Sequence, residues 1–348
     1  MDEVEIGFVE ECDSWRLSSR FFVSKVGGKP AWLDLKKIPT AKDVECRNCG
    51  NPCVFLCQIY AALDQPNAFH RQIFIFICRD FNCCELNSNK NVRVLRSQLP
   101  RENDYYPFDP PIEEKSWRPD IDASSYGPMC RVCFLRAPHR CAKCKNVNYC
   151  SKHHQVLDWK AGHKKECSED AGQISSTPGL LFLEYKIAIE SENYEGSEDE
   201  EEENDFEKEK REIEKFKMMV KNGQAGTLAD ADEADLMKMT VANEDETFLK
   251  FQETVKKHPD QILRYQRGGK PLWISAENQL KDIPKCENCN QAREFEFQVM
   301  PQLLNYLNFN DVLKSLDWGV LTIFTCKNSC DIESGFQEEF IWKQDIVS

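Results

Sequence analysis

Hydrophobic residues gather in two stretches of the chain that flank a polar middle. Four apolar runs of strand length stand out in these two stretches, namely Val54–Tyr60, Ile73–Ile77, Phe295–Met300 and Val320–Phe324. Short apolar runs bounded by turn-forming residues are typical of buried β-strands, whereas a helix usually needs about ten residues or more. The pattern predicts an α+β, β-rich fold with β units at residues 1–127 and 246–348.

The two β units repeat one order of features. Gly27–Leu33 reads GGKPAWL and Gly268–Ile274 reads GGKPLWI, and each is followed by an Ile-Pro pair, a Cys-x2-Cys pair, two apolar runs and further cysteines. Chance rarely produces such an order twice, so the sequence predicts a duplicated β domain. The GGKP stretch lacks the spacing of a phosphate-binding P-loop and predicts a structural turn beside Trp32 and Trp273.

The cysteines of each β unit lie before its first apolar run and after its second. Antiparallel pairing of the two runs would bring both cysteine pairs to one end of the hairpin, where four thiolates can form a closed zinc site. The predicted ligands are Cys286, Cys289, Cys326 and Cys330 in one unit, and Cys46, Cys49, Cys78 and Cys83 in the other, with Cys84 as the alternative to Cys83. Burial as small apolar residues is the competing interpretation.

The densest metal-binding pattern lies between the units, in residues 130–167. It contains eight ligands at spacings that suit two zinc ions, namely Cys130, Cys133, Cys141, Cys144, Cys150, His154, His163 and Cys167. Cys150 and His154 are four residues apart, as are His163 and Cys167, so each pair can share one helix face. Eight protein ligands leave no open position for water, which predicts structural rather than catalytic zinc.

Further residues around these ligands, including Tyr149–Lys152, Gln155, Trp159 and His163–Cys167, make this block resemble the MYND zinc finger. The resemblance implies cross-braced ligands: Cys130, Cys133, Cys150 and His154 on one ion, and Cys141, Cys144, His163 and Cys167 on the other. The family usually has cysteine where this chain has His154, but imidazole is also a zinc ligand. The resemblance further implies a groove for proline-rich peptides lined by Gln155 and Trp159; a core position is the alternative for Trp159.

Charge divides the middle of the chain. The net charge is −14, and residues 190–209 hold 12 acidic residues and one lysine, whereas residues 130–167 carry a net charge of +7. We expect residues 168–189 to be a connector that packs on the core and residues 190–245 to be a disordered acidic linker, with a helix at Phe206–Val220. The acidic tract would repel phosphate, so nucleic acid is an unfavoured partner.

No apolar run approaches the roughly 20 residues that cross a bilayer, and the acidic start differs from a signal peptide. We therefore expect no membrane association and a cytoplasmic or nuclear location, where the 18 cysteines stay reduced.

The full order of features resembles the programmed cell death protein 2 family, including Phe295–Tyr306 and Phe340–Gln344. That resemblance implies a dedicated chaperone or adaptor for a basic small-subunit ribosomal protein, small ribosomal subunit protein two, in 40S ribosome biogenesis. It also implies links to proliferation, stem-cell maintenance and apoptosis, in cytoplasm and nucleus. An acidic binding protein would shield such a client's positive charge and steer its association.

Two other functions compete with this one. The basic finger could serve a nuclear transcriptional regulator that recruits co-repressors or binds DNA. An enzyme is disfavoured, because the sequence has no cofactor-binding glycine motif and no His-Glu-x-x-His. Histidines outside the predicted ligand sets are scattered singly, at His70, His139, His153 and His258.

Overall fold

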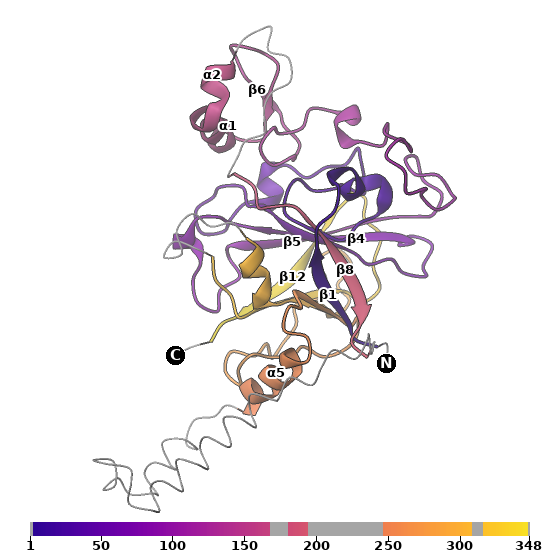
Figure 1. Ribbon diagram of the computed structural model, residues 1–348, viewed down its shortest axis with the longest axis vertical. Helices are drawn as coiled ribbons and strands as arrows, with labels where there is room; N and C mark the ends of the chain where they lie inside the picture. Colours follow the sequence, from indigo (N-terminus) through magenta and orange to yellow (C-terminus); the bar gives the residue numbers. More distant parts are fainter. Residues whose placement is uncertain (1–2, 168–179, 194–245, 308–315, 347–348) are drawn as a thin grey trace, which may run out of the picture.

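Ten β-strands close into one barrel in the computed structural model, which describes residues 3–167, 180–193, 246–307 and 316–346 (Figure 1). The strands are β1 (Glu5–Glu10), β2 (Lys25–Val26), β3 (Val54–Tyr60), β4 (His70–Ile77), β5 (Val92–Leu99), β8 (Tyr185–Ser191), β9 (Leu263–Tyr265), β10 (Arg293–Val299), β11 (Val320–Cys326) and β12 (Gln337–Gln344). Their order around the barrel is β1-β8-β2-β3-β4-β5-β12-β11-β10-β9, and every neighbouring pair is antiparallel.

Helices are short in the described residues. The finger contains the hairpin β6 (His139–Arg140) and β7 (Asn148–Tyr149), the helix α1 (Lys152–Asp158), the wider turn η6 (Trp159–His163) and α2 (Lys164–Glu166). The helix α5 (Glu246–Lys256) lies at the opposite end of the barrel from the finger (Figure 1). Short 3-10 helices are η1 (Ser14–Leu17), η2 (Ser19–Phe21), η3 (Ala41–Val44), η4 (Phe81–Cys83), η5 (Ala123–Tyr126) and η8 (Pro301–Tyr306). No helix of the described segments is both long and apolar enough to cross a membrane.

Both predicted β units contribute to the same barrel. Strands β2–β5 come from residues 1–127 and β9–β12 from residues 246–348, and they meet where β5 pairs with β12. On the other side β1 lies between β8 and β9. The end of the predicted connector forms β8, which completes the barrel wall. Residues 194–245, with most of the predicted acidic linker and its predicted helix, lie outside the described residues.

The two halves share several local arrangements. β3 and β10 each carry a β-bulge against the next strand, at Phe55/Cys57 and at Phe295/Phe297. In each half a glutamine amide bonds both backbone groups of the residue after GGKP: Gln58 binds Ala31, and Gln298 binds Leu272. These likenesses agree with a duplication, which stays a prediction.

Strand β4 explains why the chain carries a continuous apolar run at Ile73–Ile77. Its side chains alternate between the two faces of the barrel wall, as in any strand. Ile73 and Ile75 belong to the apolar core inside the barrel, whereas Phe74 belongs to a second core that also contains finger residues. Trp32 covers Phe74 on that outer face, with ring centroids 4.9 Å apart. A strand buried on both faces needs apolar residues at every position.

One end of the barrel interior is charged rather than apolar. The buried guanidinium of Arg71 in β4 donates to Glu296 in β10, and both side chains are fully buried. Burial disfavours the ionised carboxyl, but the charge of Arg71 lowers the pKa of Glu296 below its usual value. Arg96 and Arg293 likewise bind Glu339. The Arg71–Glu296 and Arg96–Glu339 pairs join strands of different halves, whereas Arg293 and Glu339 both belong to the C-terminal half.

Candidate metal centres and the docked finger

All four Cys-x2-Cys pairs lie in the same type of turn. In each turn the amide of the residue four positions after the first cysteine donates to that cysteine's carbonyl oxygen. These residues are Gly50, Phe134, Lys145 and Asn290, and each has a positive φ between 56° and 74°. The backbone amide of the first cysteine donates a hydrogen bond to the carbonyl oxygen of a residue five or six positions later in the chain. The turn therefore aims both thiols of a pair in one direction before any other ligand is added.

The structure brings the predicted ligands together in four clusters, within which the ligand atoms all lie within 4.8 Å of one another. The first finger cluster is Cys130, Cys133, Cys150 and His154, and the second is Cys141, Cys144, His163 and Cys167. The N-terminal cluster is Cys46, Cys49, Cys78 and Cys83, and the C-terminal cluster is Cys286, Cys289, Cys326 and Cys330.

Distances within the clusters fit a metal ion. Sulfur–sulfur distances of 3.5 to 3.8 Å occur in all four, as between Cys133 and Cys150 or between Cys286 and Cys330. A tetrahedron with zinc–sulfur bonds of about 2.3 Å has edges of about 3.8 Å. A disulfide would need about 2.05 Å. The donor set and its spacing are therefore compatible with zinc, and not with disulfides.

In the first finger cluster the structure selects His154 over its neighbour His153. Nδ1 of His154 lies 3.7 Å from the Cys130 sulfur and 3.1 Å from the Cys150 sulfur, while His153 is exposed. The Ser151 hydroxyl accepts a hydrogen bond from the His154 amide at the start of α1. That cap fixes the first turn of the helix, on which the histidine sits.

The second finger cluster uses the other imidazole nitrogen. Nε2 of His163 lies 3.5 Å from the Cys141 sulfur and 3.7 Å from the Cys144 sulfur. Arg131 lies behind it, 3.2 Å from His163 Nδ1 and 3.0 Å from a carboxylate oxygen of Glu166. Arg131 also approaches Asp158, which accepts a hydrogen bond from Tyr149. The two ligand sets grouped in this way are those that the MYND resemblance implies.

The finger is bound to the outside of the barrel. The indole nitrogen of Trp32 donates to the Phe134 carbonyl at 2.7 Å, and the Arg136 amide donates to the Pro39 carbonyl at 3.0 Å. Leu135 is fully buried in the core that the finger shares with Trp32 and Leu33. These contacts fix the orientation of the finger on the barrel.

Helix α1 and the following turn present a partly exposed face. Trp159 is 36% exposed and Val156 is 41% exposed, and Gln155 is partly exposed one turn away. The Trp159 ring contacts the edge of His163 at a centroid distance of 5.8 Å. Trp159 is therefore not a core residue of the finger, and its indole is available at the surface.

The fourth member of the N-terminal cluster is Cys83 rather than Cys84. Asp80 accepts a hydrogen bond from the Asn82 amide and starts η4, which places Cys83 beside Cys49 and Cys78. The Cys84 thiol instead donates to the Asp317 carbonyl.

The first thiol of this cluster is already acidic. A hydrogen bond from the neighbouring Cys53 thiol lowers the pKa of Cys46 to about 4. Thiolates are the form that binds metal. Cys53 and Cys57 are buried and Cys12 partly buried, all outside the four clusters.

The C-terminal cluster contacts the opposite half of the barrel, which sequence analysis did not predict. The guanidinium of Arg96 in β5 lies 3.6 Å from the Cys330 sulfur and 3.2 Å from the Cys330 carbonyl oxygen. Glu339, which Arg96 binds, also accepts the Cys326 amide at 3.1 Å. The available signal was weak, because β5 contains Arg93, Ser97 and Gln98 as well as Arg96.

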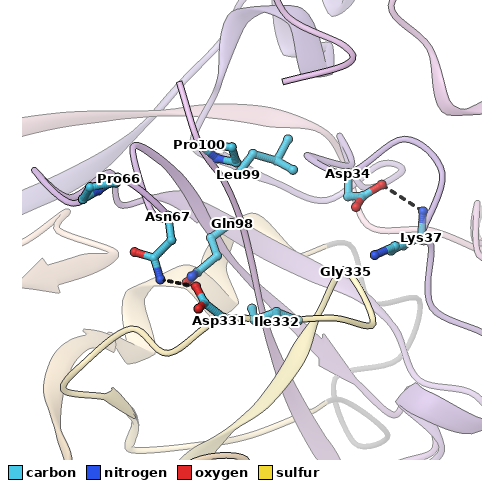
Figure 2. A pocket seen from close by; sticks show the side chains of 10 residues that line it. All are labelled: Asp34, Lys37, Pro66, Asn67, Gln98, Leu99, Pro100, Asp331, Ile332 and Gly335. Atoms are coloured by element: carbon cyan, nitrogen blue, oxygen red, sulfur yellow. Dashed lines mark hydrogen bonds between the residues drawn. The ribbon is translucent and has the colours of Figure 1, made fainter. Parts of the chain in front are cut away.

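A cavity beside this cluster was also missed. It lies between the two halves, with a volume of about 410 Å³ (Figure 2). Its lining residues are Asp34, Lys37, Pro66, Asn67, Gln98, Leu99, Pro100, Asp331, Ile332 and Gly335. No motif marks it because its walls come from four separate segments of the chain.

Comparison with known proteins agrees with this organisation. Residues 3–113 match the family "Programmed cell death protein 2, N-terminal domain", residues 245–345 match "Programmed cell death protein 2, C-terminal putative domain", and residues 130–167 match the MYND finger. No solved structure matches the chain.

Relatives align along nearly the whole length. Programmed cell death protein 2 of Mus musculus is 43% identical over 352 residues, covering 99% of this chain and 97% of the mouse protein. The Bos taurus protein of that name is 44% identical, with 99% and 96% covered. A Schizosaccharomyces pombe protein named "Probable 20S rRNA accumulation protein 4" is 23% identical, with 88% and 87% covered. The chain therefore belongs to the programmed cell death protein 2 family.

Proposed function

We propose that this chain is a zinc-stabilised protein-binding scaffold that acts as a chaperone or adaptor for a basic small-subunit ribosomal protein, namely small ribosomal subunit protein two. The observation that carries this proposal is the fixed arrangement of the finger on the barrel. The Cys-x2-Cys turns, and the core that the finger shares with the barrel, hold the exposed face of Trp159 and Val156 in one orientation relative to the barrel. Rigid presentation of a partly apolar surface favours protein binding over a purely structural role.

Two further observations support a ribosomal client. The name of the S. pombe relative refers to 20S rRNA accumulation, which connects the family to ribosome biogenesis. The net charge of −14 favours a basic partner, because opposite charge accelerates association and shields the client from nucleic acid. The proposal includes a cytoplasmic and nuclear location, downstream effects on proliferation, stem-cell maintenance and apoptosis, and no catalytic reaction.

The closed barrel constrains how a client would bind. Each of the ten strands pairs with a neighbour on both sides, so an incoming segment would have to displace existing pairing to add a strand. We therefore place client contacts on loops, on the finger face or in the cavity between the halves rather than on a sheet edge.

We also propose that all four clusters bind structural zinc. Each supplies four soft ligands, which complete a tetrahedral site without water. Zinc in the finger would supply most of the stability of residues 130–167, because so short a segment builds little core by itself.

Affinity capture of the full-length chain from cell extract tests the client. We expect a small-subunit ribosomal protein to be enriched at low salt and depleted when the salt concentration is raised, since exposed charges are screened. Absence of any ribosomal protein above background would contradict the proposal.

The exposure of Trp159 favours a second candidate, recruitment of proline-rich co-repressor segments in the nucleus. The variant Trp159→Ala separates the two functions, because it removes an exposed ring while leaving the ligands intact. If the ribosomal protein is retained and proline-rich peptides are lost, both surfaces operate independently. Loss of the ribosomal protein with unchanged zinc content would place the client on the finger.

A further inference from the structure

The cavity between the two halves offers hydrogen-bond acceptors to a ligand. Asp34 is only 8% exposed, and its Oδ1 accepts the amides of Lys36 and Lys37 at 2.9 Å and the Tyr105 hydroxyl at 2.8 Å. Its Oδ2 has no hydrogen-bond partner among the described residues. Figure 2 shows Oδ2 directed toward the Gly335 side of the cavity. The unbonded oxygen of this nearly buried carboxylate can accept a hydrogen bond from a cationic donor.

A second carboxylate stands on the opposite wall. Oδ1 of Asp331 accepts the Asn67 side-chain amide at 2.7 Å, and the rest of the carboxylate is exposed (Figure 2). The two acidic side chains come from different halves of the chain and face one cavity. Neither is neutralised by a salt bridge to a described residue.

The side-chain amide donors that line the cavity are already hydrogen-bonded within the protein. The Gln98 amide donates to the Ser329 and Cys330 carbonyls, and the Asn67 amide donates to Ser329 and Asp331. The Lys37 ammonium donates one of its three N–H groups to the Glu333 carbonyl. The lining therefore carries two carboxylates against one ammonium, and this negative balance favours a cation over a phosphate or a carboxylate.

The remaining walls suit a long apolar stem. Pro66, Leu99, Pro100 and Ile332 line the cavity, and none of its lining residues is aromatic. Grooves that bind proline-rich segments are typically lined by aromatic rings, so such a segment fits poorly. A guanidinium is planar, weakly hydrated and able to bind a carboxylate through two parallel hydrogen bonds, whereas an ammonium is a strongly hydrated point charge. Arginine therefore fits better than lysine.

The C-terminal cluster supports one wall. Asp331 directly follows the ligand Cys330, and the segment ends at Gly335, whose φ is +87°. A side chain at Gly335 would come within 2.3 Å of the Lys37 Cβ and 3.2 Å of the Asp34 Oδ2. Glycine thus lets this loop approach Asp34 closely, and the metal site fixes where the loop begins.

We propose that this cavity binds an arginine side chain from an extended segment of a basic protein partner. The identity of that partner rests on the proposed function, whereas the arginine site itself does not. The two carboxylates bind the guanidinium from opposite walls, and the proline and leucine side chains pack on its aliphatic stem.

A titration of the full-length, zinc-loaded chain with N-acetyl-L-arginine methylamide tests the site. We expect saturable shifts in the NMR signals of the Asn67 and Gln98 side-chain amides. The citrulline analogue has nearly the same shape without the charge. The lysine analogue has the charge but lacks the two parallel N–H donors of a guanidinium. Both should bind at least fivefold more weakly. Equal binding of citrulline would overturn the proposal.

Variants locate the binding. Asp331→Asn changes an exposed residue and should weaken arginine binding at least fivefold with no change in Tm. Asp104→Asn is the matched control, because Asp104 is an exposed carboxylate outside the lining residues. Arginine binding that survives Asp331→Asn, or that falls equally in Asp104→Asn, would reject the site.

Affinity capture distinguishes this inference from the proposed function. A chain that captures the ribosomal protein but does not bind the arginine probe would reject only the cavity. A chain that binds the probe at the cavity but captures no ribosomal protein would retain the cavity and reject the proposed client.

Discussion

The N-terminal and C-terminal clusters begin with the same Cys-x-Asn-Cys pattern but have different surroundings. Both begin in the same turn, and in both an asparagine, Asn48 or Asn288, donates to the backbone of the loop after the second strand. Three cysteines of the N-terminal cluster lie in the apolar core that contains the finger. The C-terminal cluster instead contacts Arg96 and the ion pairs that cross the barrel. The sequence motif thus brings the four thiols together, while the position in the barrel decides which contacts a bound metal would stabilise.

Metal removal should have the largest effect and should separate the finger from the barrel. A structural zinc contributes on the order of 10–16 kcal/mol, and residues 130–167 have little other means of folding. We expect chelation to abolish the protection of the finger from proteolysis while the barrel strands persist, because the barrel interior has its own apolar core. Native mass spectrometry of the untreated protein should count four zinc ions. A count of two would leave the barrel clusters as free thiols without metal.

Arg96→Met tests the feature that distinguishes the C-terminal cluster. It removes a fully buried cation from Glu339 and from the Cys330 loop, which should destabilise the fold by about 3–5 kcal/mol. Zinc should be lost from the C-terminal cluster before the N-terminal one. Arg93→Met is the control on the same strand, since its pair with the partly exposed Glu338 should contribute about 1 kcal/mol or less. Denaturant unfolding of both variants measures the difference, and equal losses would contradict it.

Acid should destabilise the N-terminal half through His70. Burial lowers the pKa of His70 to about 4, and its ring stacks on Phe22 and bonds the Tyr60 hydroxyl. Below about pH 6.5 the unfolded chain takes up a proton that the folded chain refuses until about pH 4, so stability falls as the pH drops through this window. The loss reaches about 3 kcal/mol at most.

The variant His70→Phe should flatten this part of the stability–pH curve, while His139→Asn, at an exposed position, should not. Strands β9–β12 contain no histidine, so the C-terminal half has no such group in its wall. Identical slopes for the wild type and His70→Phe would remove His70 as the cause.

The smallest expected effect on stability concerns the glutamine side chains that bond the backbone after the GGKP turn in both halves. Gln58→Leu and Gln298→Leu each leave the backbone groups of Ala31 or Leu272 without partners, at about 1–3 kcal/mol. Thermal unfolding should show similar losses for the two variants. A loss confined to one half would show that the two turns are not equivalent in energy.

Local chemistry was largely predictable from the sequence. Ligand spacing indicated the four clusters, because a Cys-x2-Cys turn and the end of a neighbouring strand are set by short segments. The cavity and the contact of Arg96 with Cys330 were not predictable, because residues 96 and 330 meet only after two distant halves pair along β5 and β12. The exposure of Trp159 was open in the sequence, since both a core and a surface position suit an aromatic residue.

The sequence alone determined which residues can serve as ligands, which runs form strands, and that the chain carries two similar β units around a finger. Only the tertiary structure decided that these units share one barrel, that Cys83 rather than Cys84 completes a cluster, and that Asp34 and Asp331 face a common cavity. The physical reason is range: turns and strand patterns depend on neighbours in the chain, whereas barrel closure and buried ion pairs depend on residues brought together from more than two hundred positions apart.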